Sequence, residues 1–87
     1  MNREFVLENL REAAEELAQA VIDIEADPDY DSDELLIAMQ HAYHHLNSAW
    51  NGQKISPLKA DNMTGMTWTR LGEFPSEFPL LSSPVNR

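Results

Sequence analysis

Two segments of the chain share one spacing of apolar residues, and this shared spacing restricts the fold more than any other feature. Successive apolar residues are four or three positions apart in strict alternation in both segments. Such spacing is typical of the stripe along which one α-helix packs against another. The two stripes consist of Val6, Leu10, Ala13, Leu17, Ala20 and Ile24, and of Leu35, Met39, Ala42, Leu46 and Ala49. The sequence therefore predicts two packed helices.

The ends of both helices are also marked in the sequence. We expect the first helix over about residues 2–26, because Pro28 disfavours further helix. The second helix is expected over about residues 33–51, with Asp31 and Glu34 at capping-box spacing and Gly52 as a stop. A connection this short makes the helices antiparallel neighbours in a helical hairpin.

Each helix carries a second apolar row beside its stripe. On the second helix this row consists of Leu36, Tyr43 and Trp50, which are large side chains for one hairpin to cover. Two arrangements would cover this row: the rest of the chain folds back over it, or a second copy packs against it. Packing of a second copy predicts a homodimer, in which two hairpins form a four-helix bundle.

Residues 52–87 lack helical periodicity and are rich in proline and glycine. We expect a mostly irregular segment packed across the hairpin, with one short strand over Met66–Leu71 as its only regular element. A chain of 87 residues forms one domain at most. The predicted fold is therefore a single all-α domain over residues 1–87: an antiparallel hairpin with an irregular C-terminal segment.

The charge of the chain restricts its partners. The net charge is −9, and residues 1–51 hold two basic and twelve acidic side chains. Nucleic acid and anionic membranes would repel this surface, so the expected partner is a protein, with basic proteins favoured. The simpler alternative is that the acidity only maintains solubility. The chain has no cysteine, which favours the cytoplasm, and its longest apolar run, Leu35–Met39, is too short to span a membrane.

The three histidines suggest a metal site, but their directions differ. His41 and His45 are one helical turn apart and form a workable half-site for a metal in a helical bundle. At about 100° per residue, however, His41, His44 and His45 point in different directions. The simpler interpretation is that His45 makes a hydrogen bond at the edge of the apolar face, while the other two are exposed or covered by the C-terminal segment.

The aspartates between the helices resemble the start of a calcium-binding loop only superficially. Counted from Asp27, the sixth position holds Ser32 rather than glycine, and the twelfth holds Ala38 rather than glutamate. Helix capping explains these aspartates more simply.

Catalytic motifs are absent from the sequence, so we expect neither enzymatic activity nor a cofactor. The leading functional hypothesis is a small acidic protein-interaction module, such as an adaptor, an inhibitor or an antitoxin-like protein. Two alternatives are a metal-binding helical bundle that uses His41 and His45, and a purely structural assembly subunit. The residues expected to contact a partner are the large apolar and aromatic ones: Leu36, Tyr43, Trp50, Trp68, Phe74 and Phe78.

Overall fold

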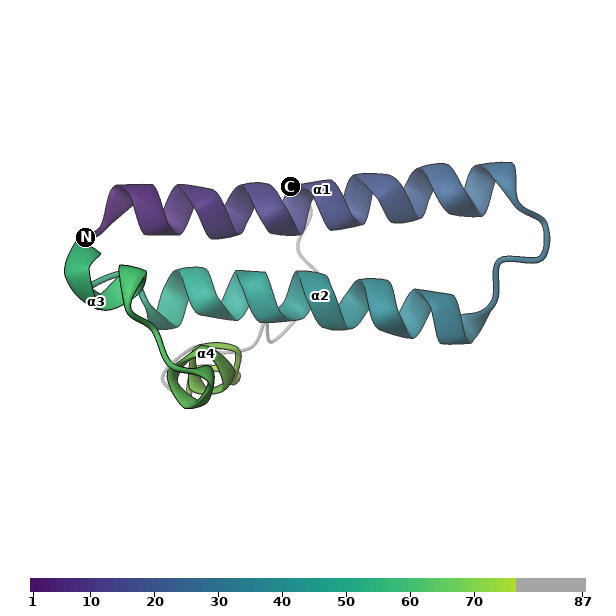
Figure 1. Cartoon of the computed structure of the whole chain (residues 1–87). Coiled ribbons are helices and arrows are strands. Elements are labelled where there is room, and N and C mark those ends of the chain that lie inside the picture. The colour runs from purple at the N-terminus through teal and green to yellow at the C-terminus, as the bar shows by residue number, and fades with distance from the viewer. Residues whose placement is uncertain (77–87) are drawn as a thin grey trace.

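The computed structural model describes residues 1–76, and every regular element in this range is a helix. Two long helices, α1 (Arg3–Ala26) and α2 (Ser32–Asn51), lie side by side in opposite directions (Figure 1). Two short helices follow, α3 (Pro57–Asp61) and α4 (Gly65–Leu71). The predicted all-α helical hairpin is therefore confirmed.

Local hydrogen bonds at the helix ends explain where the long helices begin and stop. The Asn2 side chain accepts a hydrogen bond from the Phe5 amide at the start of α1. Asp31 and Glu34 form the predicted capping box, in which each side chain accepts a bond from the backbone amide of the other residue. Gly52 ends α2 as expected. These bonds satisfy amides that a helix end leaves without a partner.

The two long helices meet through small side chains. The buried apolar residues are all alanines, Ala13 and Ala20 on α1 and Ala42 and Ala49 on α2. Alanines seven residues apart lie on one side of a helix, and they let two helix backbones approach closely. The leucines of the same stripes lie beside this contact rather than within it. The hairpin by itself therefore buries little apolar surface.

The C-terminal segment contains more helix than its sequence suggests. The strand expected over Met66–Leu71 is wrong, because Gly65–Leu71 forms α4. The Thr64 side chain caps this helix by accepting a hydrogen bond from the Thr67 amide. A helix satisfies its own backbone groups, whereas a lone strand needs a neighbouring strand to do so. The described part of the segment is thus not wholly irregular.

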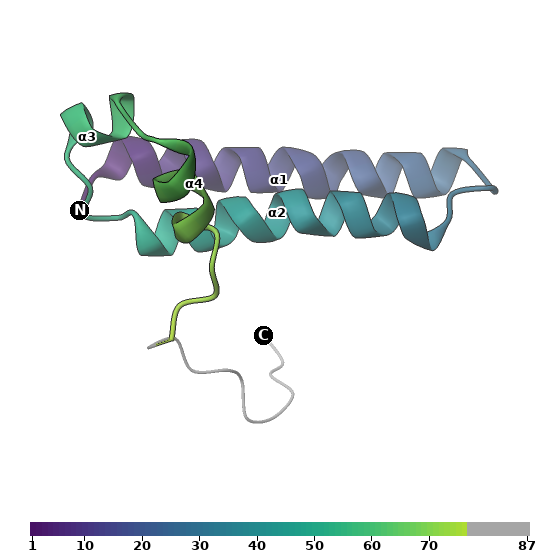
Figure 2. The same ribbon diagram turned by 60° about the horizontal axis from the view of Figure 1, so that its bottom comes forward.

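Asparagine side chains attach the C-terminal segment to the hairpin, where α4 lies against α2 (Figure 2). Asn47 donates a hydrogen bond of 3.0 Å to the carbonyl of Gly72. Asn51 donates to the carbonyls of Leu71 and Glu73. The end of α4 therefore finds hydrogen-bond donors on α2. At the start of α1, Asn2 donates in the same way to the carbonyl of Ile55, the residue that precedes α3 by two positions.

Candidate functional site

One side of the hairpin presents a continuous row of large apolar side chains, which we call the apolar face. Each of them is between 41% and 55% exposed, although all are apolar or aromatic. The face runs along most of both long helices. Its members are Leu10, Leu17, Val21 and Ile24 of α1 and Leu35, Leu36, Met39, Tyr43, Leu46 and Trp50 of α2. A contiguous apolar surface of this extent is characteristic of a protein-contact site.

The apolar face deepens into a groove at one end of the hairpin. We call this the open end, where α1 begins and α2 stops, and we call the opposite end, at the connection between the helices, the loop end. The groove has a volume of about 500 Å³, and its walls are almost entirely apolar. Leu10, Tyr43, Leu46 and Trp50 line it, and Phe74, which follows α4, forms part of its edge. The groove suits an apolar side chain from another molecule.

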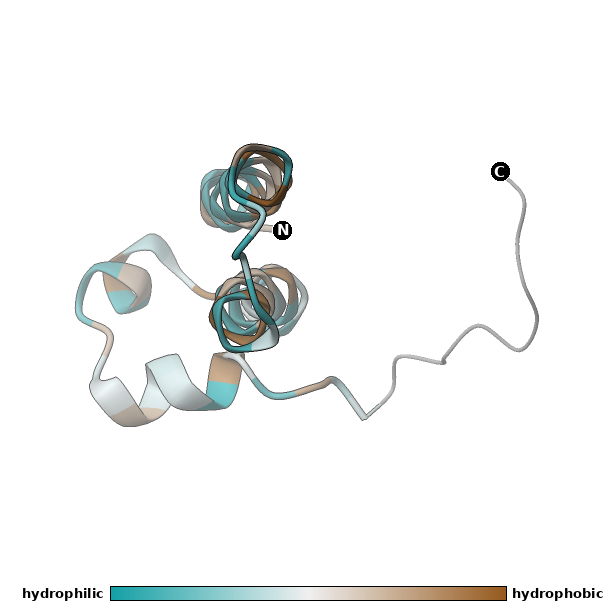
Figure 3. Ribbon diagram, turned by 90° about the vertical axis from the view of Figure 1, so that its right-hand side faces the viewer, coloured by the Kyte–Doolittle hydropathy of each residue, from teal (hydrophilic) through white to brown (hydrophobic). Residues whose placement is uncertain are grey.

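The opposite side of the hairpin, the polar face, is partly covered by the C-terminal segment. Viewed along the long helices, α3 and α4 lie on one side and the most hydrophobic residues of α1 lie on the other (Figure 3). The His44 ring stacks on the Trp68 ring, with 3.7 Å between their centroids. Its Nε2 also lies 3.3 Å from the hydroxyl of Ser48. Burial, followed by the nearby His45 and His41, lowers the pKa of His44, so neutral imidazole is the favoured form.

His45 makes a polar contact between the two long helices. Its Nδ1 lies 2.9 Å from the side-chain oxygen of Asn9, a buried residue. The amide nitrogen of Asn9 already donates to the carbonyl of Phe5, so its oxygen is the acceptor and His45 is the donor. The expected hydrogen bond from His45 is therefore confirmed, and His45 contributes to helix pairing.

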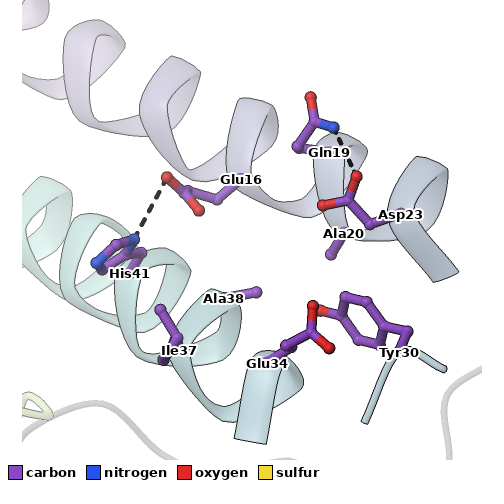
Figure 4. Close-up of a pocket in the computed structure, with 9 residues that line it drawn as sticks. All are labelled: Glu16, Gln19, Ala20, Asp23, Tyr30, Glu34, Ile37, Ala38 and His41. Carbon is purple, nitrogen blue, oxygen red and sulfur yellow. Dashed lines mark hydrogen bonds and ion pairs between the residues drawn. The ribbon is translucent and has the colours of Figure 1, made fainter. Parts of the chain in front are cut away.

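At the loop end, the polar face contains an acidic pocket (Figure 4). His41 forms an ion-pair contact of 3.4 Å with Glu16 across the two helices. Partial burial, and then the carboxylates of Glu34, Asp23 and Asp31, raise the pKa of Tyr30. Desolvation is the largest cause of this shift, and the nearby carboxylates add to it because they disfavour the charged phenolate.

The structure divides the six predicted partner-binding residues among different places. Tyr43, Trp50 and Phe74 come together at the groove. Leu36 also belongs to the apolar face but lies near the loop end. Trp68 lies on the polar side, where it stacks on His44. Phe78 lies outside the described residues. The groove and the remainder of the apolar face thus hold four of these residues.

The sequence does not predict the exposure of several members of the apolar face. The helix-packing stripes predict that Leu10, Met39 and Leu46 are interior residues. In the structure they are 42%, 53% and 48% exposed. A sequence signal for this exists: each stripe mixes large residues with alanines, and two helices in close contact through alanine leave the larger neighbours at the side.

Metal-binding residues do not gather in the described part of the chain. Among residues 1–76, no group of three or more histidine, aspartate and glutamate side chains could hold a metal ion. His41 contacts Glu16, and His45 contacts Asn9. The two histidines thus have separate polar partners on α1.

Comparisons with known proteins found no match: no family model, no curated protein and no solved structure is similar to this chain. Within the described residues, no helix is both long and apolar enough to cross a membrane.

Proposed function

We propose that this protein is a small acidic protein-interaction module whose contact surface is the apolar face. The observation that supports the proposal is the contrast between the two kinds of apolar residue. Among the apolar residues of the hairpin only alanines are buried, while ten large apolar residues of the long helices stay about half exposed on one side. Covering such residues is the main favourable contribution to protein association.

The charge distribution supports a protein as the partner. The net charge of −9 disfavours nucleic acid and anionic lipid. Carboxylates of the polar face and the loop end would increase the rate of encounter with a basic protein. A second copy of the chain is another candidate partner, as the sequence predicts. The absence of cysteine fits the cytoplasm as the compartment.

The test compares three forms of the chain as immobilised baits in an extract of the native host. Met39→Glu places a charge at the centre of the apolar face. Gln40→Glu, the matched control, adds the same charge at the exposed neighbouring position. We expect the wild-type chain and the control to retain the same protein, and Met39→Glu to bind it at least about tenfold more weakly, which corresponds to about 1.4 kcal/mol.

Circular dichroism of all three forms checks that the helices are intact. Equal retention by all three forms, or retention by none of them, would refute the assignment of the apolar face as a docking surface.

A further inference from the structure

We infer that the partner of the apolar face is a second copy of this chain, paired in the opposite direction, so that two hairpins form an antiparallel four-helix bundle. This inference rests on the proposed function and names the partner of the same surface. Four properties support it: the extent of the face, its lack of charge, the unequal charge of the two ends, and the position of the groove.

The extent of the apolar face matches a hairpin better than a single helix. Half-exposed residues occur on both long helices, from Leu10 to Ile24 on α1 and from Leu35 to Trp50 on α2. A single partner helix would cover the valley between α1 and α2 but would leave their outer rows exposed. A second hairpin offers two helices of the same lengths and an identical apolar face. Twofold pairing then makes the surface self-complementary.

The apolar face also lacks the charges that a basic partner would need. All ten of its side chains are apolar or aromatic. On α1, carboxylates such as Glu12, Glu16 and Asp23 instead line pockets on the polar face. Pairing two such faces therefore brings no carboxylates together in the interior of the bundle. A strongly basic segment docked here would bury its charges against leucine and methionine, which is costly.

The charges at the two ends determine the direction of pairing. Residues 23–34, at the loop end, hold seven carboxylates and no lysine or arginine. Three of these carboxylates, on Asp23, Asp31 and Glu34, lie close enough to Tyr30 to add to the rise of its pKa that burial causes. The open end, where α1 begins and where α3 and α4 lie (Figure 1), is mixed in charge: it holds Arg3, Lys54, Lys59 and Arg70 together with Glu4, Glu8, Asp61 and Glu73. Pairing in the same direction would place two acidic loop ends together, whereas opposite pairing places each beside an open end.

The shape of the apolar face also favours pairing in the opposite direction. The groove occupies the open end, beside Trp50 and Leu46. Near the loop end, the face holds the aliphatic side chains of Ile24 and Leu35, which are 48% and 41% exposed. Opposite pairing brings the loop-end aliphatic residues of each copy to the groove of the other. The contact occurs twice, once at each end of the bundle.

The proposed symmetry specifies which residues become neighbours at the edge of the bundle. A twofold axis that reverses the hairpin along its length places α1 of one copy over α1 of the other. Arg3 and Val21 lie in the same row of α1, since they are eighteen residues, or about five full turns, apart. Glu25 lies near that row at the other end of α1. Arg3 of each copy therefore lies near Glu25 of the other copy, and the two side chains have opposite charges.

A cross-linking experiment tests this arrangement, and the natural absence of cysteine makes it specific. Two full-length single-cysteine chains, Arg3→Cys and Glu25→Cys, are mixed and mildly oxidised, with an affinity tag on one of them. The matched control pairs Arg3→Cys with Glu15→Cys, because Glu15 is an exposed residue on the side of α1 away from the apolar face. Light scattering of the wild-type chain is measured over a range of concentrations.

We expect twice the mass of one chain, together with mixed disulfides between positions 3 and 25 in clear excess over the control pair. A dimer with no such excess would overturn the antiparallel arrangement. A wild-type chain that stays monomeric would overturn the inference altogether. If that monomer still retains another protein through a surface sensitive to Met39→Glu, the proposed function stands without self-association; if it retains none, both fail.

Discussion

At the scale of single residues, the docking of α4 on the hairpin depends on the absence of a side chain at Gly72. A Cβ atom at this position would overlap the His44 ring, which is itself stacked on Trp68. We expect Gly72→Ala to cost about 1–3 kcal/mol in the stability of the α4 contact, because the His44 ring has to leave its position. Urea titration followed by Trp68 fluorescence in a Trp50→Phe background measures this loss.

Gly65→Ala is the matched control, since a Cβ atom at Gly65 meets nothing within 4 Å. Alanine also favours helix more than glycine does, so this variant should be neutral or slightly more stable. Equal losses from both substitutions would show that overlap with the His44 ring is not the cause of the loss in Gly72→Ala.

His44 should make the α4 contact dependent on pH. Because its pKa is lowered in the folded protein, the unfolded chain binds a proton more readily than the folded one. The contribution to stability is therefore fully present above the unfolded histidine pKa of about 6.5, and it is lost as pH falls through the pKa of folded His44. We expect Trp68 fluorescence to report weaker α4 docking as the pH falls below about 6.5.

His44→Phe retains an aromatic ring against Trp68 but cannot be protonated. The pH dependence of α4 docking should disappear in this variant. A wild-type profile that is flat over the same range would contradict the role assigned to His44.

At the scale of elements, the hairpin depends on alanines that keep α1 and α2 close. Ala13 is 2% exposed and Ala42 is 3% exposed. Ala13→Leu should destabilise the hairpin by about 1–3 kcal/mol, because the larger side chain separates the helices. Ala18→Leu provides the control: Ala18 is exposed, and leucine favours helix almost as well as alanine. Helical circular dichroism during urea unfolding distinguishes the two variants.

At the scale of the whole molecule, thermal stability should depend on chain concentration if folding and pairing are coupled. Each tenfold increase in concentration should add about 1.4 kcal/mol per dimer to the free energy of unfolding, since only the folded chain pairs. The melting temperature from calorimetry should therefore rise with concentration in the wild-type chain and in Gln40→Glu. It should be independent of concentration in Met39→Glu. A wild-type melting temperature that does not vary would contradict coupled pairing.

Much of the fold could be predicted because its causes are local in the chain. The alternating four-three spacing predicts both long helices, and Pro28, Asp31 and Gly52 mark ends that the structure confirms. The strand prediction at Met66–Leu71 is wrong because the alternation there is weak, whereas the Thr64 cap favours a helix. Of the candidate docking surface, the sequence predicts Leu36, Tyr43 and Trp50, since their row exceeds what one hairpin can cover.

The sequence by itself determined two amphipathic helices, their antiparallel connection and the acidic character of the chain, because periodicity, capping and charge are properties of neighbouring residues. Only the tertiary structure decided which members of each stripe are buried. Helices that meet through Ala13, Ala20, Ala42 and Ala49 leave no room between them for the leucines of the same stripes. It also decided that α4 covers His44 on the polar side, since that contact joins segments distant in sequence. The contact through alanines and the position of α4 on the polar side together leave the large side chains of the apolar face exposed to a partner.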